Sequence, residues 1–489
     1  MGSRAAVTIG IVLVLACLAL PFVRAADKPT ASTEGREGVE GIWEGTLKVK
    51  TIELRVVFHI SAKPDGTLAA TMDSPDQGAT GIPVDTVTFE KGVLRLESKI
   101  IQGVFEGTVT ANGSAAEGTW TQPGASWPLL LKRVEKAPEL PRRPQEPKKP
   151  YPYNEEEVVF ENEKAGITLA GTLTWPRSEG PFPAVLLITG SGPQDRNETL
   201  LGHKPFLVLA DYLTRKGIAV LRVDDRGIRD KDLVATFFNS TGEDFAGDAL
   251  AGVEYLKTRT EINPKQIGLI GHSEGGLVAP MAAVRSPDVA FIVMMAGPGL
   301  VGEELLYLQG AAIIKALGAS DELLAWQRSL AERQFALLKE EKDNAAAERG
   351  LRKLEKDAEA ELSEEDRKLV DSLGSTLESD LKIMVSPWFR YFLTYDPKPT
   401  LMKVNCPVLA VIGELDLQVP PKENLPAIEE ALKAGGNEHY VVKELPGLNH
   451  LFQTAQTGAL SEYAKIEETI SPAALKIIAD WILEQTRER

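Results

Sequence analysis

Residues 266–276 read QIGLIGHSEGG, and most of the fold can be inferred from this stretch and its surroundings. A short aliphatic run ends abruptly in small residues, and a segment rich in Ala, Val and Leu follows. This pattern predicts a buried strand, a very tight turn and a helix. Gly271 and Gly275 leave room for neighbouring chain, while Ser273 takes the strained position with its hydroxyl at the carboxyl end of the strand. We therefore predict that Ser273 is a nucleophile.

The segments around this turn alternate apolar runs with helical patterns. Strands are expected at 158–160, 167–175, 183–189, 218–223, 289–295, 407–412 and 440–442, and helices at 206–216, 245–257, 277–284, 421–434 and 473–485. Strands that alternate with helices indicate a mostly parallel sheet covered by helices on both faces. The predicted fold class of residues 154–489 is therefore α/β.

Between residues 301 and 385 this alternation stops. The segment is rich in Ala, Leu, Glu and Lys, and large apolar residues such as Trp326, Leu330 and Phe335 recur at helical spacing. We expect a helical insertion, which lies over the carboxyl edge of the sheet because it follows the strand after the serine turn. A lid that shapes the binding pocket is the functional interpretation, and a solvated amphipathic cover is the alternative.

A serine hydroxyl is a poor nucleophile at neutral pH, so it needs a base and an acid that orients the base. Among five histidines, His450 lies in a loop after the last predicted strand, where a base belongs on this fold. Asp416 follows the strand that ends at Ile412 and is the predicted acid, with Glu414 as the competing carboxylate. The chain order Ser273, Asp416, His450 is the order of an α/β-hydrolase.

Two backbone N–H groups are needed to stabilise the oxyanion that such a serine generates. One is expected from Glu274, the residue after the nucleophile, at the start of the helix. The other is expected from the loop GSGPQ (190–194), whose glycines allow close approach of the backbone. Ser191, Gly192 and Gln194 each carry an N–H group there, and the sequence leaves the choice among them open; an ordinary turn is the alternative interpretation of this loop. No metal ligands are predicted.

Five segments together resemble the secreted bacterial serine carboxylesterases of the α/β-hydrolase superfamily, near its dienelactone-hydrolase and prolyl-peptidase-like branches. They are GSGPQDRNE (190–198), DDRG (224–227), GHSEGG (271–276), GELDLQVP (413–420) and LPGLNHLFQ (445–453). The resemblance covers most of residues 155–489 and implies an esterase acting on short acyl esters, with no metal or organic cofactor. It also implies that Ser273, Asp416 and His450 form the catalytic triad. The DDRG segment is interpreted as an architectural ion-pair cluster.

Residues 41–135 follow a different pattern, in which short runs of alternating polarity are separated by turn signals such as Pro64-Asp65-Gly66. About eight strands at this spacing predict a small antiparallel barrel or sandwich. A similar β domain precedes hydrolases of the group named above. Residues 136–153 are rich in proline and are expected to form a semi-rigid linker between the two domains.

The amino terminus has the composition of a secretory signal peptide (residues 1–25). A basic start at Arg4, a nearly uniform apolar run over 5–20 and small residues up to Ala25 predict cleavage, and hence a secreted or periplasmic protein. A retained membrane anchor and lipidation of Cys17 are the alternatives. Cleavage would leave Cys406 as a single thiol, so no internal disulfide is expected.

The chain has 489 residues and a formal net charge of −16, which argues against a nucleic-acid partner. The expected partner is a small-molecule ester, with contact to a cell surface or polymer through the β domain as a further hypothesis. The predicted function is a secreted serine hydrolase that cleaves carboxylic esters through an acyl-enzyme. A peptidase or thioesterase on the same fold is one alternative, and a catalytically inactive binding protein is another.

Overall fold

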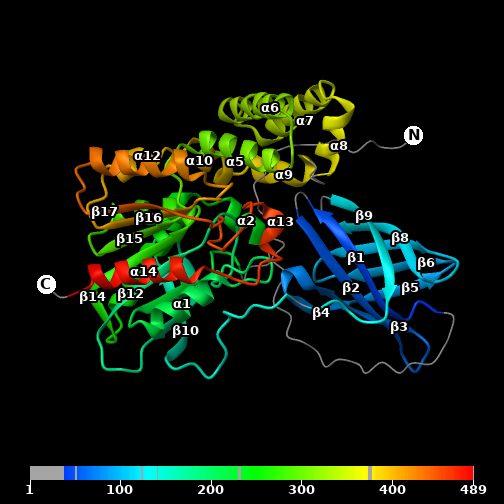
Figure 1. Cartoon of the computed structure of the whole chain (residues 1–489), viewed down its shortest axis with the longest axis horizontal. Helices are drawn as coiled ribbons and strands as arrows, with labels where there is room; N and C mark the ends of the chain where they lie inside the picture. Colours follow the sequence, from blue (N-terminus) through cyan, green and yellow to red (C-terminus); the bar gives the residue numbers. More distant parts are fainter. Residues whose placement is uncertain are drawn as a thin grey trace.

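The computed structural model describes residues 38–49, 52–122, 125–139, 141–228, 233–372 and 377–487. Two β-sheets lie at opposite ends of the molecule, and a layer of helices rises above the second one (Figure 1). The predicted signal peptide and Cys17 fall outside the described residues. No helix within the described ranges has the length and apolar character needed to cross a membrane.

Within the described residues, the amino-terminal sheet contains nine antiparallel strands in the order β4-β3-β2-β1-β9-β8-β7-β6-β5. They are β1 (Gly41–Val49), β2 (Ile52–Ala62), β3 (Leu68–Ser74), β4 (Ala79–Val84), β5 (Thr86–Glu90), β6 (Val93–Ser98), β7 (Gly103–Val109), β8 (Ala115–Gln122) and β9 (Ala125–Val134). The two edge strands, β4 and β5, are consecutive and separated by Asp85 alone, so the sheet curls into a nearly closed barrel. The sequence predicted an antiparallel barrel or sandwich of about eight strands, and the described residues form the barrel with nine strands.

Aromatic side chains fill this barrel. Trp43, Phe58, Phe105 and Trp120 are each at most 1% exposed, and the Phe58 and Trp120 rings lie 6.0 Å apart. Leu451 of the second domain joins the same apolar cluster. The barrel therefore packs directly against the loop that follows His450.

The second sheet has the strand order β10-β11-β13-β12-β14-β15-β16-β17. Its strands are β10 (Asn154–Asn162), β11 (Ile167–Trp175), β12 (Phe182–Ile188), β13 (Ala219–Val223), β14 (Ile262–His272), β15 (Phe291–Met295), β16 (Val408–Gly413) and β17 (Tyr440–Leu445). The leading hairpin is antiparallel, and β13, β12 and β14 to β17 pair in parallel. All parallel strands end at one edge, which brings the residues after them together.

Helices cover both faces of this sheet, as predicted. The helices α1 (Pro205–Arg215) and α14 (Pro472–Gln485) pack on one face, and α3 (Gly242–Lys257), α4 (Gly275–Ala283) and α12 (Pro421–Ala434) on the other. The short helices α2 (Leu233–Phe238) and α13 (Leu460–Tyr463) lie in the connections. An α/β sheet with two helical layers, preceded by an antiparallel barrel, confirms the predicted fold class.

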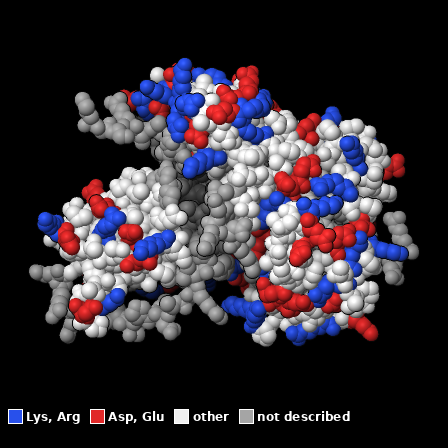
Figure 2. Space-filling view, turned by 180° about the vertical axis from the view of Figure 1, so that it is seen from behind, with Lys and Arg blue, Asp and Glu red and all other residues white. Residues whose placement is uncertain are grey.

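The predicted helical insertion is present above the sheet (Figure 1). It consists of α5 (Gly302–Ala316), α6 (Asp321–Glu340), α7 (Asn344–Glu359), α8 (Glu364–Ser372) and α9 (Leu377–Met384). Helices continue beyond the expected end at Val385, in α10 (Pro387–Thr394) and α11 (Lys398–Leu401), before β16 begins. Figure 2 shows acidic and basic side chains intermingled over the insertion and the α/β domain, with a recess between the insertion and the barrel.

Candidate active site

Ser273 occupies a left-handed backbone conformation, with φ of +54°, between the end of β14 and the start of α4. The two flanking positions must be glycine because a larger side chain would collide with the neighbouring backbone. A Cβ atom on Gly271 would lie 1.9 Å from the carbonyl oxygen of Gly275, and one on Gly275 would lie 2.3 Å from that of Ile188. A strained serine between two such glycines is the geometry of a nucleophile elbow.

The structure brings Asp416 and His450 together at the carboxyl edge of the sheet. Oδ2 of Asp416 lies 2.8 Å from Nδ1 of His450, and both residues are buried. Oδ1 of Asp416 accepts hydrogen bonds of 2.8 Å from the N–H groups of Gln418 and Val419. The competing carboxylate, Glu414, is exposed and accepts a hydrogen bond from another backbone N–H, so it does not contact His450.

The elbow is tied to the loop that carries His450. Nε2 of His272 lies 3.0 Å from the carbonyl oxygen of His450, and the two imidazole rings are 4.9 Å apart. The Ser273 hydroxyl itself makes no hydrogen bond to any described residue. The structure therefore places Ser273, Asp416 and His450 at one sheet edge without forming the serine–histidine contact, which in enzymes of this kind often tightens only when substrate binds.

The loop 190–194 lies against the elbow, since a Cβ atom on Gly190 would be 3.2 Å from Cβ of Ser273. Two of its N–H groups are occupied: that of Gly190 donates to Oε1 of Glu198, and that of Gln194 donates to Oδ2 of Asp225. Gln194 is thereby removed from the open set of oxyanion donors. The N–H groups of Ser191 and Gly192, like that of Glu274, have no acceptor among the described residues.

The segment DDRG (224–227) holds the loop 190–194 and its neighbouring residues in place through hydrogen bonds and ion pairs. Oδ1 of Asp224 accepts a hydrogen bond of 2.9 Å from the backbone N–H of Arg196, and Oδ2 pairs with the guanidinium group of the same arginine at 2.7 Å. Arg226 pairs with Asp248 of α3 at 2.7 Å. Asp225 accepts the Thr189 hydroxyl at 2.6 Å, and burial raises the pKa of Asp225 well above its ordinary value. The ion pairs of Asp224 and Arg226 match the ion-pair cluster expected from the sequence.

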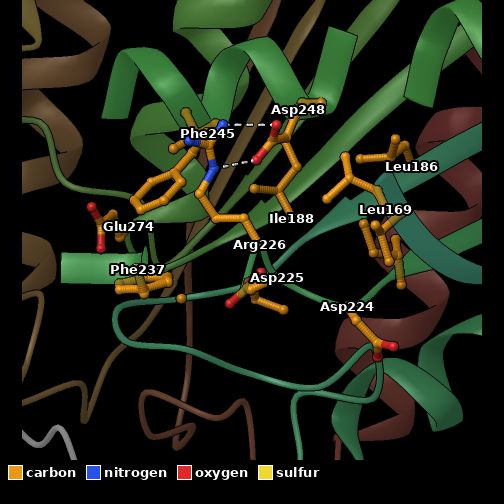
Figure 3. Close-up of a pocket in the computed structure, with 16 residues that line it drawn as sticks. Leu169, Leu186, Ile188, Asp224, Asp225, Arg226, Phe237, Phe245, Asp248 and Glu274 are labelled. Atoms are coloured by element: carbon orange, nitrogen blue, oxygen red, sulfur yellow. Dashed lines mark hydrogen bonds and ion pairs between the residues drawn. The ribbon is translucent and has the colours of Figure 1, made fainter. Parts of the chain in front are cut away.

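A cavity opens beside the elbow, between the ends of β12 and β13 and the helices α2 and α3. In Figure 3, Glu274, Phe237 and Phe245 lie at one end and Leu169 and Leu186 at the other. The further lining is Leu187, Ile188, Thr189, Gly190, Val223, Asp224, Asp225, Arg226, Asp248, Ala249 and Val278. The cavity is mainly apolar. Glu274, the residue after Ser273, forms part of its wall, so the cavity lies next to Ser273.

Glu274 joins the elbow to the helical insertion. Its carboxylate accepts a hydrogen bond of 2.9 Å from the indole N–H of Trp388 on α10, and both residues are buried. Burial raises the pKa of Glu274 to about 7, against the opposing influence of hydrogen bonds from Ser191 and Trp388. The sequence predicted only a backbone role for Glu274. Its side-chain contact with Trp388 spans 114 residues, and no local signal announces it.

The raised pKa of Glu274 predicts a pH-dependent gain in stability for Glu274→Gln. An acid with a higher pKa in the folded state than in the unfolded state binds its proton more tightly when folded. The wild-type protein therefore loses stability as the pH rises from about 4.5 to about 7, and the full loss is present above 7. This loss corresponds to about 3 kcal/mol. Gln cannot ionise, and its amide oxygen still accepts the indole N–H of Trp388. We expect urea unfolding to show the variant more stable at pH 8 and equal to wild type at pH 4; a constant difference at both pH values would contradict the prediction.

Two residues with clear contacts in the site were missed in the sequence, namely Glu198 and Trp388. Glu198 belongs to the segment GSGPQDRNE, but it is 74 residues from His272 in the sequence, and no pattern in the sequence indicates that Glu198 contacts the elbow. Among the described residues, no group of three or more His, Cys, Asp or Glu side chains is arranged to hold a metal ion.

Comparison with known proteins identifies the class to which this fold and site belong. Residues 185–462 match the model of the alpha/beta hydrolase family, which is more than half of the chain, so the protein belongs to this family.

Two curated relatives match parts of this region. Esterase EstD of Thermotoga maritima is 36% identical over 150 residues, which are 30% of this chain and 35% of EstD. The putative hydrolase YtaP of Bacillus subtilis is 34% identical over 117 residues, or 21% of this chain and 39% of YtaP. The chain thus spans little more than a third of the length of these relatives. Among solved structures, dienelactone hydrolase from Anabaena variabilis shares 16% identity, with a TM-score of 0.38, over 69% of this chain and 100% of that one.

Proposed function

We propose that this protein is a serine esterase that cleaves carboxylic esters through an acyl-enzyme. The observation that carries the proposal is the buried hydrogen bond of 2.8 Å between Asp416 and His450, at the sheet edge where the strained Ser273 also lies. A buried acid–base pair beside a strained serine is the arrangement that activates a hydroxyl for nucleophilic attack. The similarity to a bacterial esterase supports the choice of an ester as substrate.

In the proposed reaction, Nε2 of His450 takes the proton of the Ser273 hydroxyl while Oγ attacks the ester carbonyl carbon. The N–H group of Glu274, with that of Ser191 or Gly192, stabilises the resulting oxyanion. The histidine then protonates the departing alcohol as the ester C–O bond breaks. Water, deprotonated by the same nitrogen, attacks the acyl-enzyme, and the proton returns to Oγ when the carboxylic acid leaves.

We further propose that the cavity beside Glu274 receives the acyl group. Its walls are mainly aliphatic and aromatic, and bulky rings of Phe237 and Phe245 stand at the end nearest the elbow (Figure 3). An apolar pocket of this kind suits an acyl chain, and Leu169 and Leu186 at its far end limit the length of that chain (Figure 3). We therefore favour short-chain esters over long-chain ones, and the similarity to EstD favours esters over thioesters and amides.

The test is a fluorophosphonate probe together with nitrophenyl esters of two to twelve acyl carbons. The proposal predicts a single covalent adduct, located on the peptide that contains Ser273 by mass spectrometry, because the probe reacts only with an activated serine. It also predicts that kcat/KM is highest for the short esters and falls as the chain lengthens. An adduct on another residue, or no adduct, would refute the nucleophile; highest activity on the longest chains would refute the pocket assignment.

A further inference from the structure

The side chain of Glu198 lies where three segments of the proposed active site meet. Its Oε1 accepts a hydrogen bond of 2.9 Å from the N–H of Gly190, and Nδ1 of His272 lies 2.9 Å from the same oxygen. The other ring nitrogen of His272 faces the carbonyl oxygen of His450 at 3.0 Å. One carboxylate oxygen therefore connects the oxyanion loop to the elbow and, through the imidazole ring, to the loop of the base.

The contacts of His272 define its charge. Both ring nitrogens face oxygen acceptors, so both must carry a proton if both hydrogen bonds are to form. Burial alone would lower the pKa of His272, but the charge of Glu198 and its hydrogen bond raise it above the ordinary value. Formation of both hydrogen bonds therefore requires an imidazolium beside the Glu198 carboxylate, a pair that carries no net charge.

Glu198 holds this position at a cost in stability. It is 3% exposed, and its Oε2 has no hydrogen-bond partner among the described residues. Its backbone is also left-handed, with φ of +53°. An unsatisfied buried oxygen and a strained backbone both destabilise the folded state, and such features persist mainly where function requires them. Stability alone does not account for a glutamate at this place.

We propose that Glu198, acting through His272 and Gly190, is a positioning residue that sets the oxyanion hole against Ser273 and the loop of His450. Gly190 directly precedes Ser191, a candidate oxyanion donor, so the hydrogen bond from Gly190 to Glu198 fixes where that N–H group points. Oxyanion donors act over a narrow range of distances, and a misplacement of about 1 Å can cost about 10²-fold in rate. This inference rests on the proposed serine esterase function.

The experiment compares Glu198→Ala with Glu198→Gln on nitrophenyl acetate. We expect kcat per active site, counted by fluorophosphonate titration, to fall by about 10²-fold in the alanine variant with KM little changed. The Gln variant should recover activity to within about tenfold of wild type, because a single amide oxygen can accept both hydrogen bonds that Oε1 accepts. The rate of probe labelling should fall in parallel with kcat, since the phosphonate uses the same oxyanion hole.

Removal of His272 tests the second half of the inference. His272→Ala leaves a buried, unpaired carboxylate beside the oxyanion, so we expect a loss at least as large as that of Glu198→Ala. The double variant should lose no more than His272→Ala alone, since the two residues act as one unit. Losses that multiply in the double variant would show two independent roles and overturn the proposal.

A matched control removes a buried carboxylate of the barrel that makes no hydrogen bond to the elbow or to the loop 190–194 among the described residues. Asp76 of the barrel pairs with Arg55 at 2.6 Å and is 7% exposed. Asp76→Ala should lower the thermal midpoint but leave kcat per titrated site within about twofold. Equal effects of Asp76→Ala and Glu198→Ala on kcat would show a purely structural role, as would a Glu198→Ala variant with wild-type kcat. A wild-type protein that neither hydrolyses esters nor carries an adduct on Ser273 would instead refute the proposed function, and this inference with it.

Discussion

The Ser273→Ala variant is expected to hydrolyse nitrophenyl acetate with a kcat lower by on the order of 10⁵-fold, and not to react with the fluorophosphonate probe. The reason is that alanine removes the only atom that forms the acyl-enzyme. The oxyanion donors and the binding cavity remain, so a small rate above that in water should persist. Steady-state kinetics and intact-protein mass spectrometry on the same preparation give both readouts.

The fold should tolerate this substitution, because the Ser273 hydroxyl makes no hydrogen bond to a described residue. The thermal midpoint of the variant is therefore expected to stay close to that of wild type. Ser286→Ala is the control, since Ser286 lies beyond the end of α4 and, among the described residues, its hydroxyl oxygen accepts just the backbone N–H of Asp288. A Ser273→Ala protein that keeps a tenth or more of the wild-type activity would exclude Ser273 as the nucleophile.

The elbow could be predicted from sequence because the residues that it requires are consecutive in the chain. The backbone of Ser273 is strained, and positions 271 and 275 require glycine because a Cβ atom there would lie 1.9 and 2.3 Å from the carbonyl oxygens of Gly275 and Ile188. Those demands fall within five consecutive residues, so they leave a readable pattern. The same holds for Asp416, whose place follows directly from the end of β16.

Contacts that join distant segments could not be predicted in this way. His272 meets Glu198 across 74 residues, and Glu274 meets Trp388 across 114. Each pair forms because loops and helices from distant parts of the chain fold over the same sheet edge. The hydrophobic periodicity within one segment does not specify that arrangement. The loop 190–194 is an intermediate case: its location was predicted, but only the acceptors on Glu198 and Asp225 show which of its N–H groups remain open.

The barrel illustrates a limit of periodicity itself. About eight strands were expected, whereas the described residues form nine. The strands β4 and β5 are separated by Asp85 alone, so no run of turn residues marks the boundary between them. Helices continue beyond the predicted insertion to Leu401. The helix α10 begins at Pro387 with Ser386 as its N-cap, and this start signal comes directly after the end of α9.

Asp416→Asn is expected to lower kcat by on the order of 10⁴-fold while leaving KM and the fold nearly unchanged. Oδ1 of Asp416 is held by the N–H groups of Gln418 and Val419, and only an oxygen can accept those two hydrogen bonds. The amide nitrogen of the substituted side chain must therefore take the place of Oδ2, 2.8 Å from Nδ1 of His450. It would donate to that nitrogen and move the ring proton to Nε2, where the base needs a lone pair.

The matched control for this variant is Glu414→Gln, which neutralises the neighbouring carboxylate. Glu414 is exposed and, within the described part of the chain, accepts a hydrogen bond from the backbone N–H of Gly447 alone, so kcat should stay within about twofold of wild type. Proton NMR gives an independent readout, because a downfield Nδ1–H signal from His450 requires the Asp416 carboxylate and should vanish in Asp416→Asn alone. If Glu414→Gln lost more activity than Asp416→Asn, the acid would be Glu414. If neither lost activity, His450 would need no orienting carboxylate, and the buried pair would be structural.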